Sequence, residues 1–196
     1  VWASSLVSAE MVAEVKPGAE LIDSASASLE DVAAAYQRAH DEGLLVARVH
    51  TGDPSIYGAT GEQYEQCRQL GLDYETVPGV SAYSATAARM NAEITIPEVC
   101  QSFILTRLEG GRTPMPPRET VRGFAAHGAT MALYLSAARN KQLQDELLAG
   151  GYPPQTPVII GHRVSWPDQV VLRCRLDELS ATMKDHKFWK HTVILV

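Results

Sequence analysis

The sequence contains only three cysteines, and their spacing does not suit a shared structural role. Cys67, Cys100 and Cys174 lie far apart and form no CxxC pair. Disulfide frameworks and zinc sites usually show closely spaced or paired cysteines. The pattern therefore indicates reduced thiols, as in a cytoplasmic protein, and argues against a zinc site.

Long apolar runs and an excess of positive charge are also absent. No run approaches the roughly 20 residues that a membrane span needs, and no signal peptide is visible. The formal net charge is −6, whereas general nucleic-acid binders usually carry a basic surface. We therefore expect neither a membrane nor a nucleic acid as partner, while a local basic pocket is still compatible with this charge.

Several well-known catalytic motifs are missing. The sequence has no GxxxxGK[ST] phosphate loop, no GxGxxG loop and no GxSxG elbow. His186 and His191 lack ligand-like spacing to an acid or a thiol, so no metal site is expected. His50 and His162 each stand at a predicted strand end, where a histidine either lines a pocket or, more often, caps a sheet. No residue has the isolated, buried character of a general base, and the catalytic residue stays unassigned.

The first half of the chain alternates helical and extended patterns. The chain has 196 residues, with 45% hydrophobic and 20% charged residues, which is typical of a soluble globular protein. Ser28 and Asp31 resemble a capping box at the start of a helix. We predict helices over residues 10–15, 29–40, 61–70 and 81–91, a possible strand over 20–24, and buried strands over 44–49 and 74–77.

The second half alternates differently and predicts a mixed, partly antiparallel sheet. We expect strands over residues 102–106, 130–135, 158–162, 169–174 and 192–196, with helices over 119–127, 140–149 and 176–183. The loop 110–117, rich in proline and glycine, is either a functional lid or a plain connection. The fold class is therefore α/β in two domains, residues 1–98 and 99–196.

Two glycine loops stand at the carboxyl ends of predicted strands. Residues 51–54 read TGDP and residues 78–81 read PGVS. Glycine lets a backbone approach a ligand closely, and α/β sheets bind ligands beyond the carboxyl ends of their strands. We therefore expect the two loops to meet at one pocket. Asp53 either holds the turn by accepting backbone hydrogen bonds or shapes a ligand-contacting loop, and both roles are compatible.

These loops and several later stretches resemble the tetrapyrrole methylases, a family that uses S-adenosylmethionine to build cobalamin and sirohaem. The first half contributes TGDPSIYG and VPGVSA. The second half contributes QSFILTR, GATMALYLS, TPVIIGHRVSWPDQ and a closing TVILV. The resemblance covers essentially the whole chain, and the second-half stretches select a branch of the family that acts in cobalamin biosynthesis.

The resemblance implies where the cofactor binds. Family members fold as two α/β domains with S-adenosylmethionine in the cleft between them. Carried over by motif, the cofactor contacts are Thr51, Gly52, Asp53, Ile56, Ser81, Ala82, Leu135 and Val164. Methyl transfer from a sulfonium rests mainly on positioning, which suits a site of glycine loops and apolar side chains.

The resemblance also implies the substrate and the assembly. The family's substrates are polycarboxylate macrocycles, and guanidinium groups match carboxylates. Arg89 and Arg163 are candidates, and the stronger set for substrate binding is Arg107, Arg112 and Arg118. Family members are homodimers, so a homodimer is expected. They also begin with a strand and a GxGPGD-type loop that this sequence lacks, which predicts a truncated first domain and weak cofactor binding.

Three alternatives stay open at this point. The first is a methylase of the same family that acts on another tetrapyrrole intermediate. The second is a non-catalytic α/β module that binds a nucleotide-like ligand, and the third is a domain that serves mainly for dimerisation.

Overall fold

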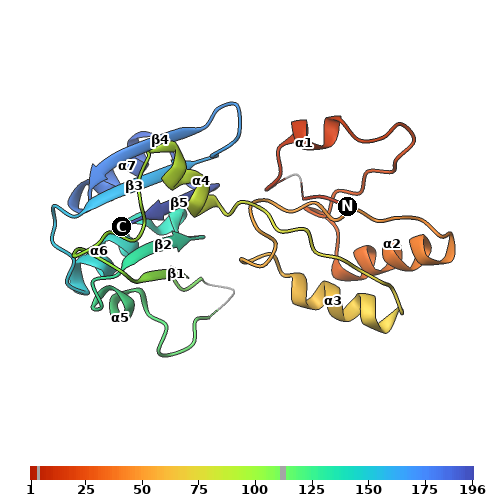
Figure 1. The fold of residues 1–196 in the computed structure, drawn as a ribbon, viewed down its shortest axis with the longest axis horizontal. Coiled ribbons are helices and arrows are strands. Elements are labelled where there is room, and N and C mark those ends of the chain that lie inside the picture. Colours follow the sequence, from red (N-terminus) through yellow and green to blue (C-terminus); the bar gives the residue numbers. More distant parts are fainter. Residues whose placement is uncertain (4, 111–113) are drawn as a thin grey trace. The chain divides into compact units, whose positions relative to one another are not determined.

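The chain folds as two compact units, Val1–Ser81 (unit 1) and Ala82–Val196 (unit 2) (Figure 1). A computed structural model describes residues 1–3, 5–110 and 114–196.

The described residues of unit 1 form three helices, and side-chain caps start the first two of them. They are α1 (Ala9–Ala13), α2 (Leu29–Asp41) and α3 (Thr60–Gln69). The Ser28 hydroxyl accepts from the Asp31 N–H at 3.1 Å, while the Asp31 carboxylate accepts from the Ser28 N–H at 2.9 Å. This reciprocal pair satisfies two N–H groups that the helix itself cannot satisfy, and it confirms the predicted capping box.

Helices α2 and α3 pack together through the apolar face of α2. Val32, Tyr36 and Ala39 are buried there at helical spacing. The Tyr36 hydroxyl donates to Gln63 Oε1 of α3 at 3.3 Å, so the polar tip of a buried ring has a partner.

The buried strands predicted over 44–49 and 74–77 are wrong. Both segments run without regular pairing, and Leu45 is 98% exposed while Val77 is 74% exposed. Among the described residues, no backbone hydrogen bond joins one segment to the other. Residues 20–24 likewise form only a bridge, between Asp23 and Trp2. Their composition favours extended backbone, but a strand also requires a neighbour at hydrogen-bonding distance.

Unit 2 is built on a five-stranded mixed sheet in the order β1-β2-β5-β3-β4. β1 and β2 pair in parallel, and the other neighbours pair antiparallel. The predicted strands and the β3–β4 hairpin are confirmed to within one residue. The elements are α4 (Ala82–Arg89), β1 (Phe103–Arg107), α5 (Val121–Ala125), β2 (Thr130–Tyr134), the 3-10 turn η1 (Ala137–Arg139), α6 (Asn140–Ala149), β3 (Pro157–His162), β4 (Val170–Arg175), the 3-10 turn η2 (Leu176–Glu178), α7 (Leu179–Asp185) and β5 (Thr192–Leu195).

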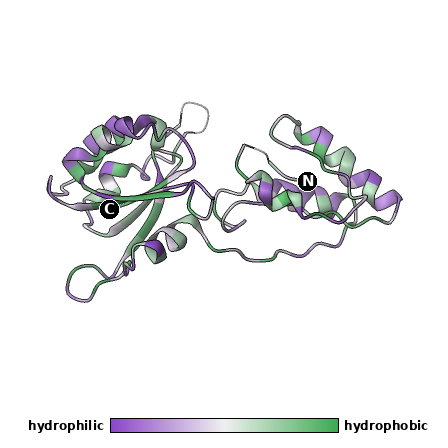
Figure 2. Ribbon diagram, turned by 90° about the horizontal axis from the view of Figure 1, so that it is seen from above, coloured by the Kyte–Doolittle hydropathy of each residue, from purple (hydrophilic) through white to green (hydrophobic). Residues whose placement is uncertain are grey.

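The sheet is buried on both faces, with hydrophobic residues concentrated in its strands (Figure 2). Met131 and Leu133 of β2 pack with residues of α5, α6 and α7 in the larger core. Ala132, between them, packs on the opposite face in a smaller cluster that includes Ala87 of α4. Side chains alternate along a strand, so β2 serves both faces.

Helix α4 lies very close to the sheet. A Cβ added at Gly161 of β3 would lie 2.2 Å from Thr86 Oγ1 of α4, so only glycine permits this approach. Because α4 packs on β3 and β5, the compact units divide at Ser81, earlier in the chain than the boundary expected near Glu98.

No helix among the described residues combines the length and the apolar character needed to cross a membrane. In the same part of the chain, no group of three or more histidine, cysteine or acidic side chains gathers as a metal site would.

Candidate functional site

In unit 1, the two glycine loops meet through the side chain of Asp53. Its Oδ2 accepts from the Gly79 N–H at 3.0 Å, which joins the loop 78–81 to the loop 51–54. Its Oδ1 accepts from the Ser55 N–H at 2.8 Å and also from the Ser55 hydroxyl. The two loops are thus in contact, and Asp53 is the residue that joins them. That they line one pocket stays a prediction.

Hydrogen bonds hold Asp53 in its ionised form. The Ser55 hydroxyl, the Ser55 N–H and the Gly79 N–H, in that order, lower the pKa of its carboxyl group. Donors directed at a carboxylate favour the charged state. Asp53 is therefore a fixed negative acceptor that organises backbone N–H groups, and it is unsuited to proton transfer at neutral pH.

Gly79 is required by the distance between the two loops. A Cβ built at Gly79 would stand 2.1 Å from the Gly52 carbonyl oxygen, a separation that no side chain tolerates. Gly52 itself has a φ of +64°, in the left-handed region that favours glycine. The two glycines thus allow backbone to lie against backbone at the expected ligand loops.

The first loop continues into a tight turn before α3. A Cβ at Gly58 would lie 2.1 Å from the Pro54 carbonyl oxygen, and the flanking Tyr57 and Ala59 have φ values of 55° and 50°. The Ile56 N–H donates to the Asp53 carbonyl at 3.1 Å. Of the predicted cofactor residues in unit 1, Thr51 and Gly52 are exposed, Asp53 and Ile56 are half-buried, and Ser81 is buried.

In unit 2, register brings the remaining predicted residues to one edge of the sheet. Arg107 ends β1, which runs parallel to β2. β5 runs antiparallel to β2 and β3, and Thr192 at its start pairs with His162 at the end of β3. Leu135 and Val164 follow β2 and β3, so they lie at the same edge. The carboxyl ends of strands meet there, as at ligand sites of other α/β sheets.

Strained backbone is concentrated at this edge. Leu135, Arg163, Ser165 and His191 have φ values of 50°, 48°, 77° and 53°. Leu135 is also 67% exposed, although it lies two residues after the fully buried Leu133. Left-handed backbone at residues other than glycine costs free energy and is frequent at ligand-binding positions. This edge is therefore the candidate ligand-binding region of unit 2.

The first turn of α4 is anchored at the same edge. The Tyr83 N–H donates to the Tyr134 hydroxyl at 3.1 Å, which satisfies an N–H that the helix leaves unpaired. Ala82, the first residue of α4, is thereby held near the end of β2. Nothing in the local sequence signals this bond, which joins residues 51 positions apart, and sequence reasoning missed Tyr134.

The arginines predicted for substrate binding fall on the segment that follows β1. Arg107 Nη2 donates to the Pro114 carbonyl at 3.2 Å, which ties the strand end to the loop. Arg118 is exposed further along the same connection. Arg112 lies outside the described residues.

Arg163 and its surroundings form a second basic and aromatic cluster at the sheet edge. Its guanidinium carbon lies 4.1 Å from the centre of the Trp166 ring, and Nη1 donates to Asp168 Oδ2 at 2.6 Å. The Trp166 ring in turn stacks on His191 at 5.3 Å. These contacts hold the loop that carries Val164, and sequence reasoning missed the part that Trp166 plays.

His162 packs as a structural residue. Its ring stacks on Phe188 at 4.2 Å, and Nδ1 lies 3.0 Å from Thr192 Oγ1. Burial, followed by the charges of Arg163 and His191, lowers the pKa of His162. A histidine at a strand end can line a pocket or cap the sheet, and the contacts of His162 match the second role.

The sequence matches the family model described as Tetrapyrrole (Corrin/Porphyrin) Methylases over residues 3–180. Among curated relatives, the cobalt-precorrin-4 C(11)-methyltransferase of Priestia megaterium is 40% identical over 195 residues, which cover 100% of this chain and 75% of the relative. The precorrin-4 C(11)-methyltransferase of Mycobacterium tuberculosis (strain ATCC 25618 / H37Rv) is 40% identical over 196 residues, which cover 100% of this chain and 78% of the relative.

Solved structures give the same picture. The X-ray structure of the cobalamin biosynthetic enzyme cobalt precorrin-4 methyltransferase has a TM-score of 0.94 at 40% identity, covering 99% of this chain and 81% of that chain. The uroporphyrin-III C-methyl transferase of Thermus thermophilus, complexed with S-adenyl homocysteine, has a TM-score of 0.65 at 22% identity, covering 85% of this chain and 72% of that chain. The second likeness concerns the fold alone.

Proposed function

The chain belongs to the tetrapyrrole (corrin/porphyrin) methylases, and from this membership we propose that it methylates C11 of precorrin-4, or of cobalt-precorrin-4, in cobalamin biosynthesis. The observation that carries the proposal is 40% identity to C(11)-methyltransferases across 100% of this chain. The methyl donor is S-adenosylmethionine.

The cofactor contacts we propose fall in both units. In unit 1 they are Thr51, Gly52, Asp53, Ile56 and Ser81, and in unit 2 they are Ala82, Leu135 and Val164. The residues present fit such a molecule in two respects. Glycines at 52 and 79 let the two loop backbones lie against each other beside Asp53, and Leu135 exposes an apolar side chain on strained backbone.

This chain's residues act by positioning. The sulfonium of S-adenosylmethionine supplies a methyl group already bonded to a good leaving group. What the protein contributes is alignment of donor and acceptor and exclusion of water, which can lower the barrier by about 7–11 kcal/mol in well-oriented reactions. Asp53, which joins the two glycine loops, keeps their backbone groups in place.

For the substrate, we propose that Arg107, Arg112 and Arg118 contact the carboxylates of the macrocycle. Guanidinium groups bind carboxylates through paired N–H donors. The Arg107 guanidinium is tied to Pro114 of the same connection, which supports a shared role for the loop.

We propose further that the enzyme is a cytoplasmic homodimer, as the cysteine pattern and the family resemblance suggest. Light scattering on the purified protein tests the assembly, and a monomer at micromolar concentration would contradict it. Fractionation of cells that express the tagged protein tests the compartment.

The decisive experiment supplies precorrin-4 and cobalt-precorrin-4 separately, with S-adenosylmethionine carrying a labelled methyl group. Label at C11, located by NMR, is the expected result. Label at another ring position would show methylation of the same macrocycle with a different regiospecificity and would contradict the proposal. Binding of both ligands without transfer would favour the non-catalytic binding module.

A further inference from the structure

The hydroxyl of Ser136 joins the ends of β1 and β2 in unit 2. It accepts a hydrogen bond from the Leu108 N–H at 2.8 Å and donates one to the Tyr134 carbonyl at 2.6 Å. Arg107 and Tyr134 form the last pair of the parallel ladder between the two strands. The hydroxyl therefore extends the connection between the strands by one side-chain step beyond that ladder.

Ser136 makes these bonds in a buried environment. Its exposed fraction is 1%, and that of Leu108 is 4%. A buried backbone N–H that loses its acceptor destabilises a protein much more than an exposed one does, because solvent does not replace the lost partner. The Leu108 N–H therefore depends on the Ser136 hydroxyl.

The bond from Ser136 to the Tyr134 carbonyl spans a single residue, Leu135. Leu135 has a φ of 50° and is 67% exposed. Left-handed backbone is unfavourable for leucine, because Cβ comes too close to the following carbonyl oxygen, and it persists only where the surroundings enforce it. The hydroxyl supplies such a constraint, because it fixes the residues before and after Leu135 relative to each other.

Ser136 lies between a proposed cofactor contact and the proposed substrate loop. Leu135 directly precedes it in the chain, and its bonding partner Leu108 directly follows Arg107, where that loop begins. The Arg107 guanidinium is tied to the same loop through the Pro114 carbonyl at 3.2 Å. Methyl transfer requires donor and acceptor to be held in a fixed geometry. One buried side chain thus connects the backbone segments that carry both sets of contacts.

We propose that Ser136 is a positioning residue for the methyl transfer. Its hydroxyl holds Leu135 in the left-handed backbone that presents the leucine side chain to S-adenosylmethionine, and it fastens this contact to the end of β1. The inference rests on the proposed role of Leu135 as a cofactor contact. Removal of the hydroxyl acts on the cofactor through Leu135.

The variant Ser136→Ala tests the proposal with two measurements. Backbone chemical shifts of isotope-labelled protein report whether Leu135 is left-handed, and we expect this signature in the parent and its loss in the variant. Isothermal titration gives the Kd for S-adenosylhomocysteine. It should rise by about fivefold or more, because only the fraction of molecules with left-handed Leu135 is then ready to bind. In steady-state assays, KM for S-adenosylmethionine should rise by a larger factor than kcat falls.

Two further substitutions of buried serines complete this series. Ser136→Cys keeps a weaker donor and acceptor at the same position, so its Kd should lie between those of the parent and Ser136→Ala. Ser180→Ala is the matched control. Ser180 is 5% exposed and donates to Asn140 Oδ1 at 2.8 Å, between α7 and α6. This variant should lower the melting temperature about as much as Ser136→Ala does, and it should leave the Kd unchanged.

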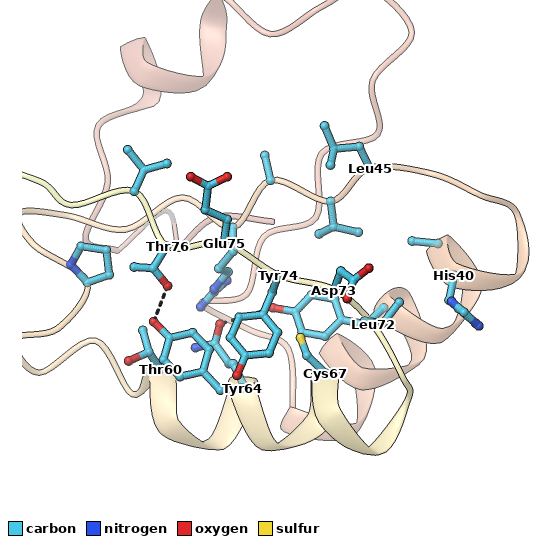
Figure 3. A pocket seen from close by; sticks show the side chains of 18 of the residues that line it. His40, Leu45, Thr60, Tyr64, Cys67, Leu72, Asp73, Tyr74, Glu75 and Thr76 are labelled. Carbon is cyan, nitrogen blue, oxygen red and sulfur yellow. Dashed lines mark hydrogen bonds between the residues drawn. The ribbon is translucent and has the colours of Figure 1, made fainter.

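A second control lies in unit 1, beside the groove that Figure 3 shows. The Tyr64 hydroxyl lies 2.7 Å from Thr76 Oγ1, as the dashed line marks, and Thr76 is exposed. Thr76→Ala removes this hydroxyl and should leave the chemical shifts of Leu135 unchanged. It separates an effect at the sheet edge from the general effect of losing a side-chain hydroxyl.

Three results would overturn the role of Ser136. They are a Leu135 that stays left-handed in Ser136→Ala, a Kd that changes with the conformation of Leu135 in neither serine variant, and a Kd that rises equally in Ser180→Ala. The proposed function has a separate test. If the parent binds S-adenosylhomocysteine but transfers no label to C11, that function fails, while the role of Ser136 toward the cofactor is still decided by the Kd and the chemical shifts.

Discussion

At the scale of single residues, Gly79 is the position where the meeting of the two loops is most sensitive to change. Gly79→Ala would place a Cβ 2.1 Å from the Gly52 carbonyl oxygen, so the loops must separate. We expect the affinity for S-adenosylhomocysteine to fall by about fivefold or more, because such overpacking costs about 1–3 kcal/mol and about 1.4 kcal/mol corresponds to a factor of ten. Isothermal titration measures the effect.

Gly61→Ala is the matched control for this prediction. No atom lies within 4 Å of a Cβ at Gly61, which belongs to α3. Alanine favours helices, so this variant should bind like the parent and melt no earlier. Equal affinity of the Gly79→Ala protein and the parent would remove the proposed role of the junction.

Asp53 predicts a pH effect of definite sign. Its pKa is lowered in the folded protein, so its contribution to stability is fully present above the unfolded pKa, near 4. That contribution is lost as the pH falls through the folded pKa. At pH 7 the parent should have a higher melting temperature than the Asp53→Asn variant, and this difference should disappear below about pH 4. Thermal melts across pH measure it, and a gap independent of pH would contradict the assignment.

Asp73→Asn serves as the comparison, because Asp73 is an exposed acid in the same unit. Its melting temperature should follow that of the parent at every pH.

Some residues of the candidate site could be predicted from local sequence, and others could not. Asp53 and Gly79 could be predicted to meet because sharp glycine turns after extended runs are local signals. The family resemblance supplied Leu135 and Val164. Tyr134 could not be predicted, since its bond to the Tyr83 N–H depends on the packing of α4 on the sheet.

At the scale of elements, the contact between α4 and β3 is tight enough to test by a compensating pair. Gly161→Ala would place a Cβ 2.2 Å from Thr86 Oγ1, a buried hydroxyl that has no hydrogen-bond partner among the described residues. We expect a loss of about 1–3 kcal/mol in the free energy of unfolding. The double variant with Thr86→Ala should recover most of it, because the added methyl then occupies the vacated space.

Urea denaturation of the parent, both single variants and the double variant measures the coupling between the two positions. If the losses in the free energy of unfolding are strictly additive, Gly161 and Thr86 are not in the close contact that links β3 and α4.

The connection between β1 and α5 carries the prediction for the substrate. Arg118→Ala removes an exposed cation from this loop and should raise KM for the tetrapyrrole several-fold. The affinity for S-adenosylhomocysteine should not change. Arg112→Ala should behave in the same way.

Arg122→Ala is the control, because Arg122 lies on the neighbouring α5 and pairs with Glu146. It should leave both KM and the affinity for S-adenosylhomocysteine unchanged. Loss of cofactor affinity alone in Arg118→Ala would contradict the assignment.

Elements whose signals are local could be predicted, and those that depend on distant partners could not. The Ser28 capping box and α6 follow from a few neighbouring residues. The strands predicted in unit 2 are observed as strands because each has a partner in the sheet. Residues 44–49 and 74–77 carry the same apolar, β-branched signal, yet no backbone hydrogen bond between described residues joins them. Composition reports a preference for extended backbone and does not report whether a neighbour exists.

At the scale of the whole molecule, the two units should differ in their resistance to local opening. The central strands of unit 2 are fully buried at Met131, Leu133, Ile160 and Ile194, whereas residues 44–47 of unit 1 are exposed. Amides of β2 and β5 should exchange with solvent at least about a hundredfold more slowly than those of 44–47, because opening a packed core costs far more than opening an exposed segment outside any sheet. Exchange mass spectrometry on the purified protein measures this difference. Equal protection of both regions would show that the exposed segment is paired in solution.

Because β2 contributes side chains to the cores on both faces of the sheet, its own length is constrained. One residue inserted into β2 would shift the parity of everything after it, so Leu133 would turn toward α4 and a small alanine would face α6. No local adjustment restores both layers at once. Natural variants of this enzyme should therefore gain or lose residues in the connection after β1 and keep β2 at constant length.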